Sequence, residues 1–287
     1  MAAGNQWIDF SRFHSRLRVT GRLRTETALR IGSGGSDSPT EHDLPVVKDL
    51  RGRPYIPGSS VKGVLRAHLE RLLRGLDERL ACLSTSRPAK AGVLTGCLTQ
   101  GDVDALKAAH QNDPDELARQ ILKRSCWTCS LFGAPWLASK VMIRDLPVIE
   151  ETWFERYLIR DGVAIDRDTE TAGNQLKYDF EAVPAGTEFT FEMVVENPSE
   201  AELGLALLGL REFEQGHIAL GGASSRGLGQ VCLELDWDRS EWLTAGQLKA
   251  YFAGQPPQAL ADESVRTGYW KAFLAALENG KETAEHA

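Results

Sequence analysis

Tyr55-Ile-Pro-Gly-Ser-Ser-Val-Lys-Gly-Val-Leu-Arg66 joins a short apolar stretch to a helical pattern through a Pro-Gly turn. Apolar side chains recur at helical spacing after it, which predicts a helix over about residues 61–80 with Ser59 or Ser60 as its N-cap. The first turn of a helix offers unpaired N–H groups and a partial positive charge, so a phosphate group fits there. Four side chains add hydrogen-bond donors to this turn: Ser59, Ser60, Lys62 and Arg66. A plain helix cap with exposed cations explains the same residues.

The residues before this stretch predict two strands separated by a flexible loop. Asp43-Leu-Pro-Val-Val-Lys-Asp49 contains a short strand over 44–48, and it follows a loop over 31–40 that is rich in Gly and Ser. Residues 16–24 alternate between apolar and other residues, which predicts a strand with one buried face. Its other face carries Arg16, Arg18, Arg22 and Arg24. Arginine rather than lysine or glutamate on this face favours an anion as partner over a merely solvated surface.

A second loop of related composition lies far along the chain. Gly221-Gly-Ala-Ser-Ser-Arg-Gly-Leu-Gly229 combines glycines, which permit close approach of the backbone to a ligand, with three side-chain donors. These donors and their glycine neighbours are Gly221, Gly222, Ser224, Ser225, Arg226 and Gly227. The spacing matches neither a Walker A loop nor a dinucleotide fingerprint. A tight bend between a helix and a strand is the alternative reading, and the arginine argues against it.

The remaining patterns predict an α+β protein. Helices are expected over about 100–122, 201–215, 244–253 and 263–278. Strands are expected over about 141–145, 188–195 and 230–235, with a hairpin across 157–164 and 175–183. This order fits a ferredoxin-like core with insertions, in which the helices cover one face of a sheet.

Composition restricts the class of protein. The 287 residues are 42% apolar and 25% charged, which is ordinary for a globular protein with a real core. The N-terminus has no signal-peptide pattern, and the apolar run near 203–210 is too short to cross a bilayer, so we expect a cytoplasmic protein without a membrane partner. The net charge of −7 counts against nucleic-acid binding. Residues 1–80, however, hold 14 Lys and Arg against 9 Asp and Glu, which places an anion-binding surface in the N-terminal third.

Four of the five cysteines are clustered in the sequence. Cys82, Cys97, Cys126 and Cys129 lie within 81–135, and the last two form a C-x-x-C pair. In a cytoplasmic chain this indicates a metal site rather than a disulfide framework, and four thiolate ligands fit a closed, structural zinc site. His110 is an alternative ligand. A redox C-x-x-C fits less well, because no thioredoxin-like βαβ pattern surrounds it.

Asp43 is the candidate catalytic residue. It follows the flexible loop and precedes the strand that leads to the first anion-binding turn, where an aspartate can act as a general base or bind a divalent cation. Asp37 and His42 are close rivals. A loop aspartate is often only a turn former, and this reading stays open.

Together these motifs resemble the RAMP superfamily, and most closely the backbone subunits of type III CRISPR–Cas effector complexes. The residues that carry the resemblance span about 16–235: Ile31-Gly-Ser-Gly-Gly35, Asp43–Asp49, Tyr55–Arg66, Leu131-Phe-Gly-Ala134, Tyr178-Asp-Phe-Glu181 and Gly221–Gly229. The cysteine site is similar to that of the type III-D and III-E branches. The resemblance implies an RRM-like domain over 1–240, with a zinc-bearing insertion at about 81–135 and a "thumb" β-hairpin at about 160–180, followed by a helical extension over 241–287.

The resemblance also implies a function. Copies or paralogues of the subunit assemble along a CRISPR RNA, the Ser59–Arg66 turn and the Gly221–Gly229 loop contact that RNA, and the thumb flips one guide nucleotide per subunit. From the arginine face of residues 16–24, Arg22 is the further candidate for RNA binding. The family's catalytic aspartate falls on Asp43, which would cleave bound target RNA with Mg²⁺ or Mn²⁺. The alternatives are a non-catalytic structural subunit of the same complex and a nuclease that processes CRISPR RNA. The latter usually needs a histidine-centred site, and the histidines here do not cluster in sequence.

Overall fold

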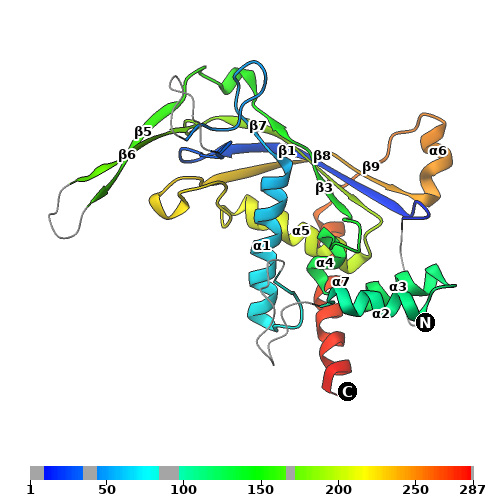
Figure 1. Cartoon of the computed structure of the whole chain (residues 1–287). Helices are drawn as coiled ribbons and strands as arrows, with labels where there is room; N and C mark the ends of the chain where they lie inside the picture. Colours follow the sequence, from blue (N-terminus) through cyan, green and yellow to red (C-terminus); the bar gives the residue numbers. More distant parts are fainter. Residues whose placement is uncertain (1–9, 35–43, 84–96, 166–171, 286–287) are drawn as a thin grey trace.

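The computed structural model describes residues 10–34, 44–83, 97–165 and 172–285. Within these residues, five strands form an antiparallel sheet in the order β3-β7-β1-β8-β9 (Figure 1). These strands are β1 (Ser15–Thr25), β3 (Val141–Ile143), β7 (Glu188–Glu196), β8 (Val231–Thr244) and β9 (Gln258–Ala259). Two strand pairs lie apart from this sheet: β2 (Tyr55–Ile56) with β4 (Leu146–Pro147), and β5 (Leu158–Ile165) with β6 (Ala172–Ala182). In Figure 1 the β5–β6 hairpin extends away from the body of the molecule.

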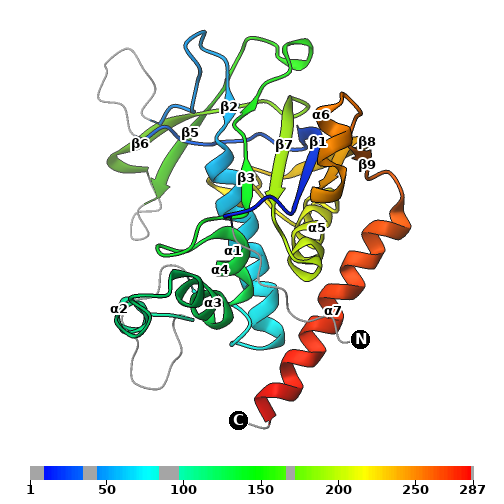
Figure 2. The same ribbon diagram turned by 90° about the vertical axis from the view of Figure 1, so that its right-hand side faces the viewer.

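The helices are α1 (Gly58–Leu76), α2 (Gln100–Ala109), α3 (Pro114–Arg124), α4 (Trp127–Phe132), α5 (Glu200–Glu214), α6 (Leu248–Phe252) and α7 (Glu263–Glu285). Apart from α6, which lies near β9 at the end of the sheet, they gather on one side of the sheet, as Figures 1 and 2 show. Single 3₁₀ turns are η1 (Glu150–Thr152), η2 (Ser224–Arg226) and η3 (Ala245–Gln247). The chain order β1-α1-β3-β7-α5-β8 is a β-α-β-β-α-β arrangement. The predicted α+β class is confirmed, and the sheet is antiparallel. Among the described residues, none of the helices combines the length and apolar character that a bilayer crossing requires.

Strand β1 is the centre of the sheet, and one of its faces is buried, as its alternating pattern predicts. Leu17, Val19 and Leu23 are fully buried on the helix side. Its neighbours are β7 and β8, both antiparallel to it. The helix-side core therefore rests on one N-terminal strand held between two strands from the C-terminal half.

The start of α1 differs from the prediction. The N-cap is Pro57, which makes no side-chain capping bond, and Ser59 and Ser60 lie inside the first turn, so neither is the cap. Instead, Asp145 from the β3–β4 connection accepts a hydrogen bond from the backbone N–H of Gly58 at 2.8 Å. The pairing of β2 with β4 brings this connection to the helix start, which is a tertiary contact that local sequence does not show.

The predicted helix over 100–122 is two helices. Asp113 accepts the backbone N–H of Glu116, and Pro114 takes the first position of α3, so the chain stops and restarts there. The two helices bury a small cluster of their own: Leu98, Val103, Leu106 and Ile121. The insertion therefore has a separate small core.

The last helix belongs to the main core. The boundary expected at residue 240 falls inside β8, which continues to Thr244. Helix α7 contributes Phe273 and Leu277 to the main hydrophobic cluster, and the Phe273 ring meets Trp127 edge-on at 5.5 Å between centroids. Helix α7 is thus packed, through these two residues, against the domain that precedes it.

The close packing of α5 on α7 gives a testable prediction. A Cβ at Gly204 would lie 2.2 Å from the backbone oxygen of Tyr269, so Gly204→Ala must push the two helices apart. We expect it to lower the free energy of unfolding by about 1–3 kcal/mol, measured by urea denaturation. Gly63→Ala is the matched control: its Cβ would meet nothing within 4 Å, and it should stabilise α1 by about 0.5–1 kcal/mol. Equal effects at both positions would contradict this account of the packing.

Candidate functional site

The four clustered cysteines meet in space. Their Sγ atoms all lie within 4.8 Å of one another, with Cys82 and Cys129 at 3.3 Å and Cys82 and Cys126 at 3.6 Å. Cys126 and Cys129 lie at the start of α4 and within it, Cys82 follows α1, and Cys97 precedes α2. The base of the insertion is thus the place where these three elements converge.

The cluster fits a tetrahedral zinc ion. Zn–S bonds of about 2.3 Å put neighbouring sulfurs roughly 3.8 Å apart, close to the separations found here, whereas a disulfide needs about 2 Å. All four cysteines are free thiols. Hydrogen bonds within the cluster lower the pKa of Cys126 and raise the pKa values of Cys82 and Cys129. Among the described residues, the group of side chains that could hold a metal ion consists of the four cysteines and does not include His110.

Neighbouring groups orient the sulfurs. The backbone N–H of Cys82 donates to Cys126 Sγ at 3.4 Å, and the Arg66 guanidinium donates to Cys129 Sγ at 3.5 Å. Arg66 also binds Glu70 at 2.7 Å and the carbonyl oxygen of Gly133 at 2.9 Å. This arginine therefore ties α1 to the cysteine cluster.

The structure gives Lys62 and Arg66 partners within the protein. Lys62 Nζ donates to Ser139 Oγ at 2.7 Å, and burial, followed by the charge of Arg66, lowers the pKa of Lys62. Lys62 and Arg66, the two cations of this predicted phosphate site, both contact the 133–139 segment. Ser59 is exposed and Ser60 half-buried, so the serines are the members of this turn that remain open to solvent.

The second predicted loop has an anchored end and an open tip. Gly221 has φ +76°, and a Cβ there would lie 2.1 Å from the backbone oxygen of Arg30. The N–H of Gly222 donates to the same oxygen at 2.8 Å. Ser224, Ser225 and Arg226 form the exposed 3₁₀ turn at the tip, and Gly227 beside them has φ +81° with no heavy atom within 4 Å of its would-be Cβ. Backbone and side-chain donors are therefore accessible at the tip.

This loop contacts the base of the β5–β6 hairpin. Arg226 donates to the Tyr178 hydroxyl at 2.9 Å, and the Tyr178 ring stacks on Phe180 at 6.4 Å between centroids. The guanidinium of Arg30 lies 5.6 Å from the centre of the Phe180 ring. We call Arg30, Tyr178, Phe180 and Arg226 the hairpin–loop junction. Arg30 is not among the predicted site residues, and its only sequence signal is a lone charge between apolar residues at the start of a Gly-rich loop.

Asp43 lies outside the described residues, as do its rivals Asp37 and His42. The described chain resumes at Leu44, whose backbone oxygen accepts the N–H of Glu181 at 3.2 Å and which forms a parallel bridge with Phe180. Leu44 also packs against the small cluster that contains Phe180 and Leu228. The residue that follows Asp43 is therefore part of the surroundings of the hairpin–loop junction.

Three arginines on the half-exposed face of β1 pair with glutamates. Arg18 pairs with Glu192 at 2.9 Å, and Arg22 pairs with Glu188 at 3.4 Å. Arg24 pairs with Glu26 at 2.9 Å. Sequence alternation shows the arginines but not the acidic side chains that β7 and β8 place beside them.

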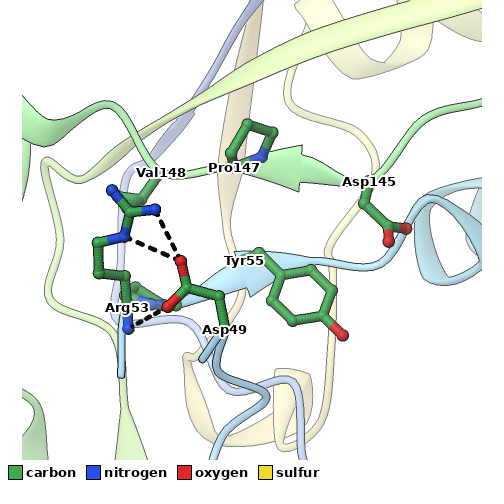
Figure 3. Close-up of a pocket in the computed structure, with 7 residues that line it drawn as sticks. Asp49, Arg53, Tyr55, Asp145, Pro147 and Val148 are labelled. Carbon is green, nitrogen blue, oxygen red and sulfur yellow. Dashed lines mark hydrogen bonds and ion pairs between the residues drawn. The ribbon is translucent and has the colours of Figure 1, made fainter. Parts of the chain in front are cut away.

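A separate cavity of about 280 Å³ lies between the β2–β4 pair and the preceding turn. Its lining is Asp49, Arg53, Pro54, Tyr55, Asp145, Pro147 and Val148. Figure 3 shows Asp49 turned toward Arg53, and hydrogen bonds from the backbone and side chain of Arg53 lower the pKa of Asp49. Asp145 caps α1. Both carboxylates thus already have partners, and the cavity contains none of the predicted site residues.

Curated relatives cover most of the chain. This chain is 29% identical over 238 residues to a protein of Methanothermobacter thermautotrophicus named "CRISPR system Cms endoribonuclease Csm3". The aligned region covers 77% of this chain and 84% of that protein. A protein of the same name from Streptococcus thermophilus is 28% identical over 229 residues, covering 77% of this chain and 88% of that protein. The Methanocaldococcus jannaschii protein of that name is 26% identical over 227 residues, covering 74% of this chain and 76% of that protein.

The family match covers both of the loops and the cysteine cluster. Residues 22–232 match the RAMP superfamily, from the middle of β1 to the start of β8. This span includes the hairpin–loop junction and the whole insertion. Because the match extends over well more than half of the sequence, the chain belongs to the RAMP superfamily.

Proposed function

We propose that this chain is a Csm3-like backbone subunit of a type III CRISPR effector complex, which holds CRISPR RNA and cleaves bound target RNA. The observation that carries the proposal is the similarity to three proteins named endoribonucleases over about three quarters of the chain. The β-α-β-β-α-β order supports an RRM-like core. The partners would be CRISPR RNA, target RNA and other effector subunits, including copies or paralogues of the chain, in the cytoplasm.

The hairpin–loop junction supports RNA binding. Its loop tip offers hydroxyl, backbone and guanidinium donors, which suit phosphate oxygens, and its hairpin offers aromatic rings next to them. The exposed serine at the start of α1, Ser59, can add a donor. Single-stranded RNA is recognised through this combination of phosphate contacts and aromatic side chains.

Cleavage would use the RNA's own nucleophile. If the hairpin holds the RNA backbone splayed, a 2′-hydroxyl can attack the adjacent phosphorus while the 5′-oxygen leaves. Asp43 would accept the 2′-hydroxyl proton, a water molecule would protonate the departing 5′-oxygen, and the products would be a 2′,3′-cyclic phosphate and a 5′-hydroxyl end. Mg²⁺ or Mn²⁺ would supply charge stabilisation for the phosphodiester.

The cysteine cluster would have a structural role. Four thiolate ligands leave no open position on a tetrahedral zinc ion, so the metal would hold the insertion to α1 and α4 rather than take part in cleavage. A zinc-bearing insertion also supports placing the chain near the type III-D and III-E branches.

Labelled target RNA, incubated with the assembled complex and Mg²⁺, tests the proposed function. We expect cleavage only of RNA complementary to the guide, with products that carry cyclic-phosphate and 5′-hydroxyl ends, and loss of cleavage in EDTA. Binding of target RNA without cleavage would instead identify a structural subunit. Cleavage of CRISPR repeat RNA by the chain alone would identify a processing nuclease, and each of these two outcomes contradicts the proposal.

A further inference from the structure

The β5–β6 hairpin contacts the rest of the protein through one face of β6. Within the described residues it is a two-stranded sheet of its own, which isolated bridges near its base join to the body. Alternate side chains along β6 share a face, and on this face Phe180 and Ala182 are buried in a small cluster. Tyr178 is the next residue of this row toward the tip of the hairpin. A contact made by Tyr178 can therefore control the angle of the hairpin.

The Tyr178 side chain connects the hairpin to the tip of the second loop. Its hydroxyl accepts a hydrogen bond from Arg226 Nη1 at 2.9 Å. Tyr178 and Ala223 also both pack against the cluster that contains Phe180. Ala223 has φ +62°, a left-handed conformation that costs energy for a residue with a side chain and persists where the surrounding structure holds it. The hairpin face and the loop tip thus support each other.

A glycine on the opposite strand makes room for this arrangement. Gly162 of β5 pairs directly with Tyr178 of β6. A Cβ at Gly162 would lie 2.3 Å from Tyr178 Cζ, so the tyrosine ring lies across the bare backbone of β5. The φ of Gly162 is not positive, and in a strand of ordinary conformation glycine is less favourable than alanine. The ring that covers Gly162 therefore accounts for the glycine, whereas its backbone conformation does not.

We propose that Tyr178 is a positioning residue that holds the hairpin against the loop tip and thereby selects which phosphodiester bond of the target RNA is cut. This rests on the proposed function, in which the loop holds the guide strand and the hairpin splays the target RNA paired with it. The relative position of loop and hairpin then decides which bond is splayed. Arg226 can serve both partners, because a guanidinium carries five N–H donors and Tyr178 occupies only Nη1.

The position of the cut made by the assembled complex tests this assignment. Tyr178→Phe removes the hydroxyl and leaves the aromatic ring and the charge of Arg226 in place. We expect an unchanged dissociation constant for target RNA. The ratio of product cut at the principal bond to product cut at neighbouring bonds should fall about tenfold, the size expected for loss of one hydrogen bond to a charged group. An end-labelled target resolved at single-nucleotide resolution gives this ratio.

Tyr251→Phe is the matched control for the hydroxyl. It removes the same group from α6, which lies at the other end of the sheet from the hairpin (Figure 1). Both the dissociation constant and the product ratio should stay at their unsubstituted values.

Gly162→Ala separates positioning from stability. The added methyl group must displace the Tyr178 ring, so the cut should spread to neighbouring bonds as in Tyr178→Phe. Because alanine suits a strand better than glycine does, the temperature of unfolding should stay close to that of the unsubstituted chain. Gly75→Ala is the control, since a Cβ there meets nothing within 4 Å, and its cut should stay in place. A purely structural role of Tyr178 would not spread the cut in a protein of unchanged stability.

Hydrogen exchange in the chain alone tests the contact between hairpin and loop without RNA. In Tyr178→Phe, backbone amides of both β6 and the Gly221–Gly229 loop should exchange about tenfold faster, because each element loses support from the other. Tyr251→Phe should leave the exchange of both elements unchanged.

The results distinguish this inference from the function on which it depends. Unchanged cut positions in Tyr178→Phe, with normal cleavage by the unsubstituted complex, would overturn the role of Tyr178 alone. A loss of target affinity in Tyr178→Phe with the cut in place would show an RNA-binding residue instead of a positioning residue. Absence of guide-directed cleavage by the unsubstituted complex would contradict the proposed function and the selection of the cut together. Unchanged hydrogen exchange in Tyr178→Phe would overturn the contact between hairpin and loop itself.

Discussion

Replacing Asp43 by alanine is expected to slow target-RNA cleavage by the assembled complex about 10²–10⁴-fold while leaving target-RNA binding unchanged. The reason is that a positioned general base contributes a factor of this size, whereas the contacts that hold the RNA come from other residues. Single-turnover cleavage of a labelled target, measured together with its dissociation constant, separates the two quantities. Asp43→Asn should lose as much activity as Asp43→Ala, because the amide keeps the shape of the side chain but cannot accept the proton.

Asp37→Ala and His42→Ala are the matched controls, since both positions lie in the same stretch of sequence. We expect each to retain cleavage within a few-fold of the unsubstituted complex. Cleavage at the unsubstituted rate by Asp43→Ala would show that Asp43 is not the base. A large loss in one of the control variants alone would transfer the role to that residue.

Exchange of Cys129 for serine should remove the metal and lower the free energy of unfolding by more than about 4 kcal/mol. Structural zinc in small domains contributes on the order of 10–16 kcal/mol of binding free energy, and loss of one thiolate forfeits a large part of it. The effect should reach α1, because Arg66 contacts both Cys129 and Gly133. Elemental analysis for zinc and chemical denaturation of the same preparation measure the two effects.

Cys232→Ser provides the control for the cysteine chemistry. Cys232 is a free thiol outside the cluster, so its replacement should leave both zinc content and stability unchanged. A strong chelator should lower the stability of the unsubstituted protein to that of Cys129→Ser. Purified protein that holds no zinc and is as stable as the Cys129→Ser variant would contradict a structural metal.

The elements and the cysteine cluster follow from local sequence patterns. Alternation gives β1, and helical spacing gives α1 and α5, because one face of each must be buried. The C-x-x-C pair indicates the metal site because two thiols at this spacing reach one ion. In each case the prediction depends on residues that are close together in the sequence.

Apart from the helix break at Asp113-Pro114, which is a local signal, the features missed by sequence reasoning depend on distant residues. Arg18 and Glu192 are 174 positions apart, and the aspartate that caps α1, Asp145, is 87 positions from Gly58. Arg30 lies against the Phe180 ring and beside Gly222, and both are distant from it in sequence. Such pairs carry no periodicity, so the sequence shows the charges without showing which of them are neutralised.

The central position of β1 also determines when the sheet can form during synthesis. β1 is complete at Thr25, but β7 ends at Glu196 and β8 at Thr244. At about 5–20 residues per second, the ribosome leaves β1 without either partner for roughly 10–35 s. An unpaired strand with an apolar face is prone to pair with other nascent chains, and its four arginines oppose this through mutual repulsion between copies. Arg18 and Arg22, which meet Glu192 and Glu188 in the finished sheet, therefore carry their charge on the nascent strand before those two glutamates have been made.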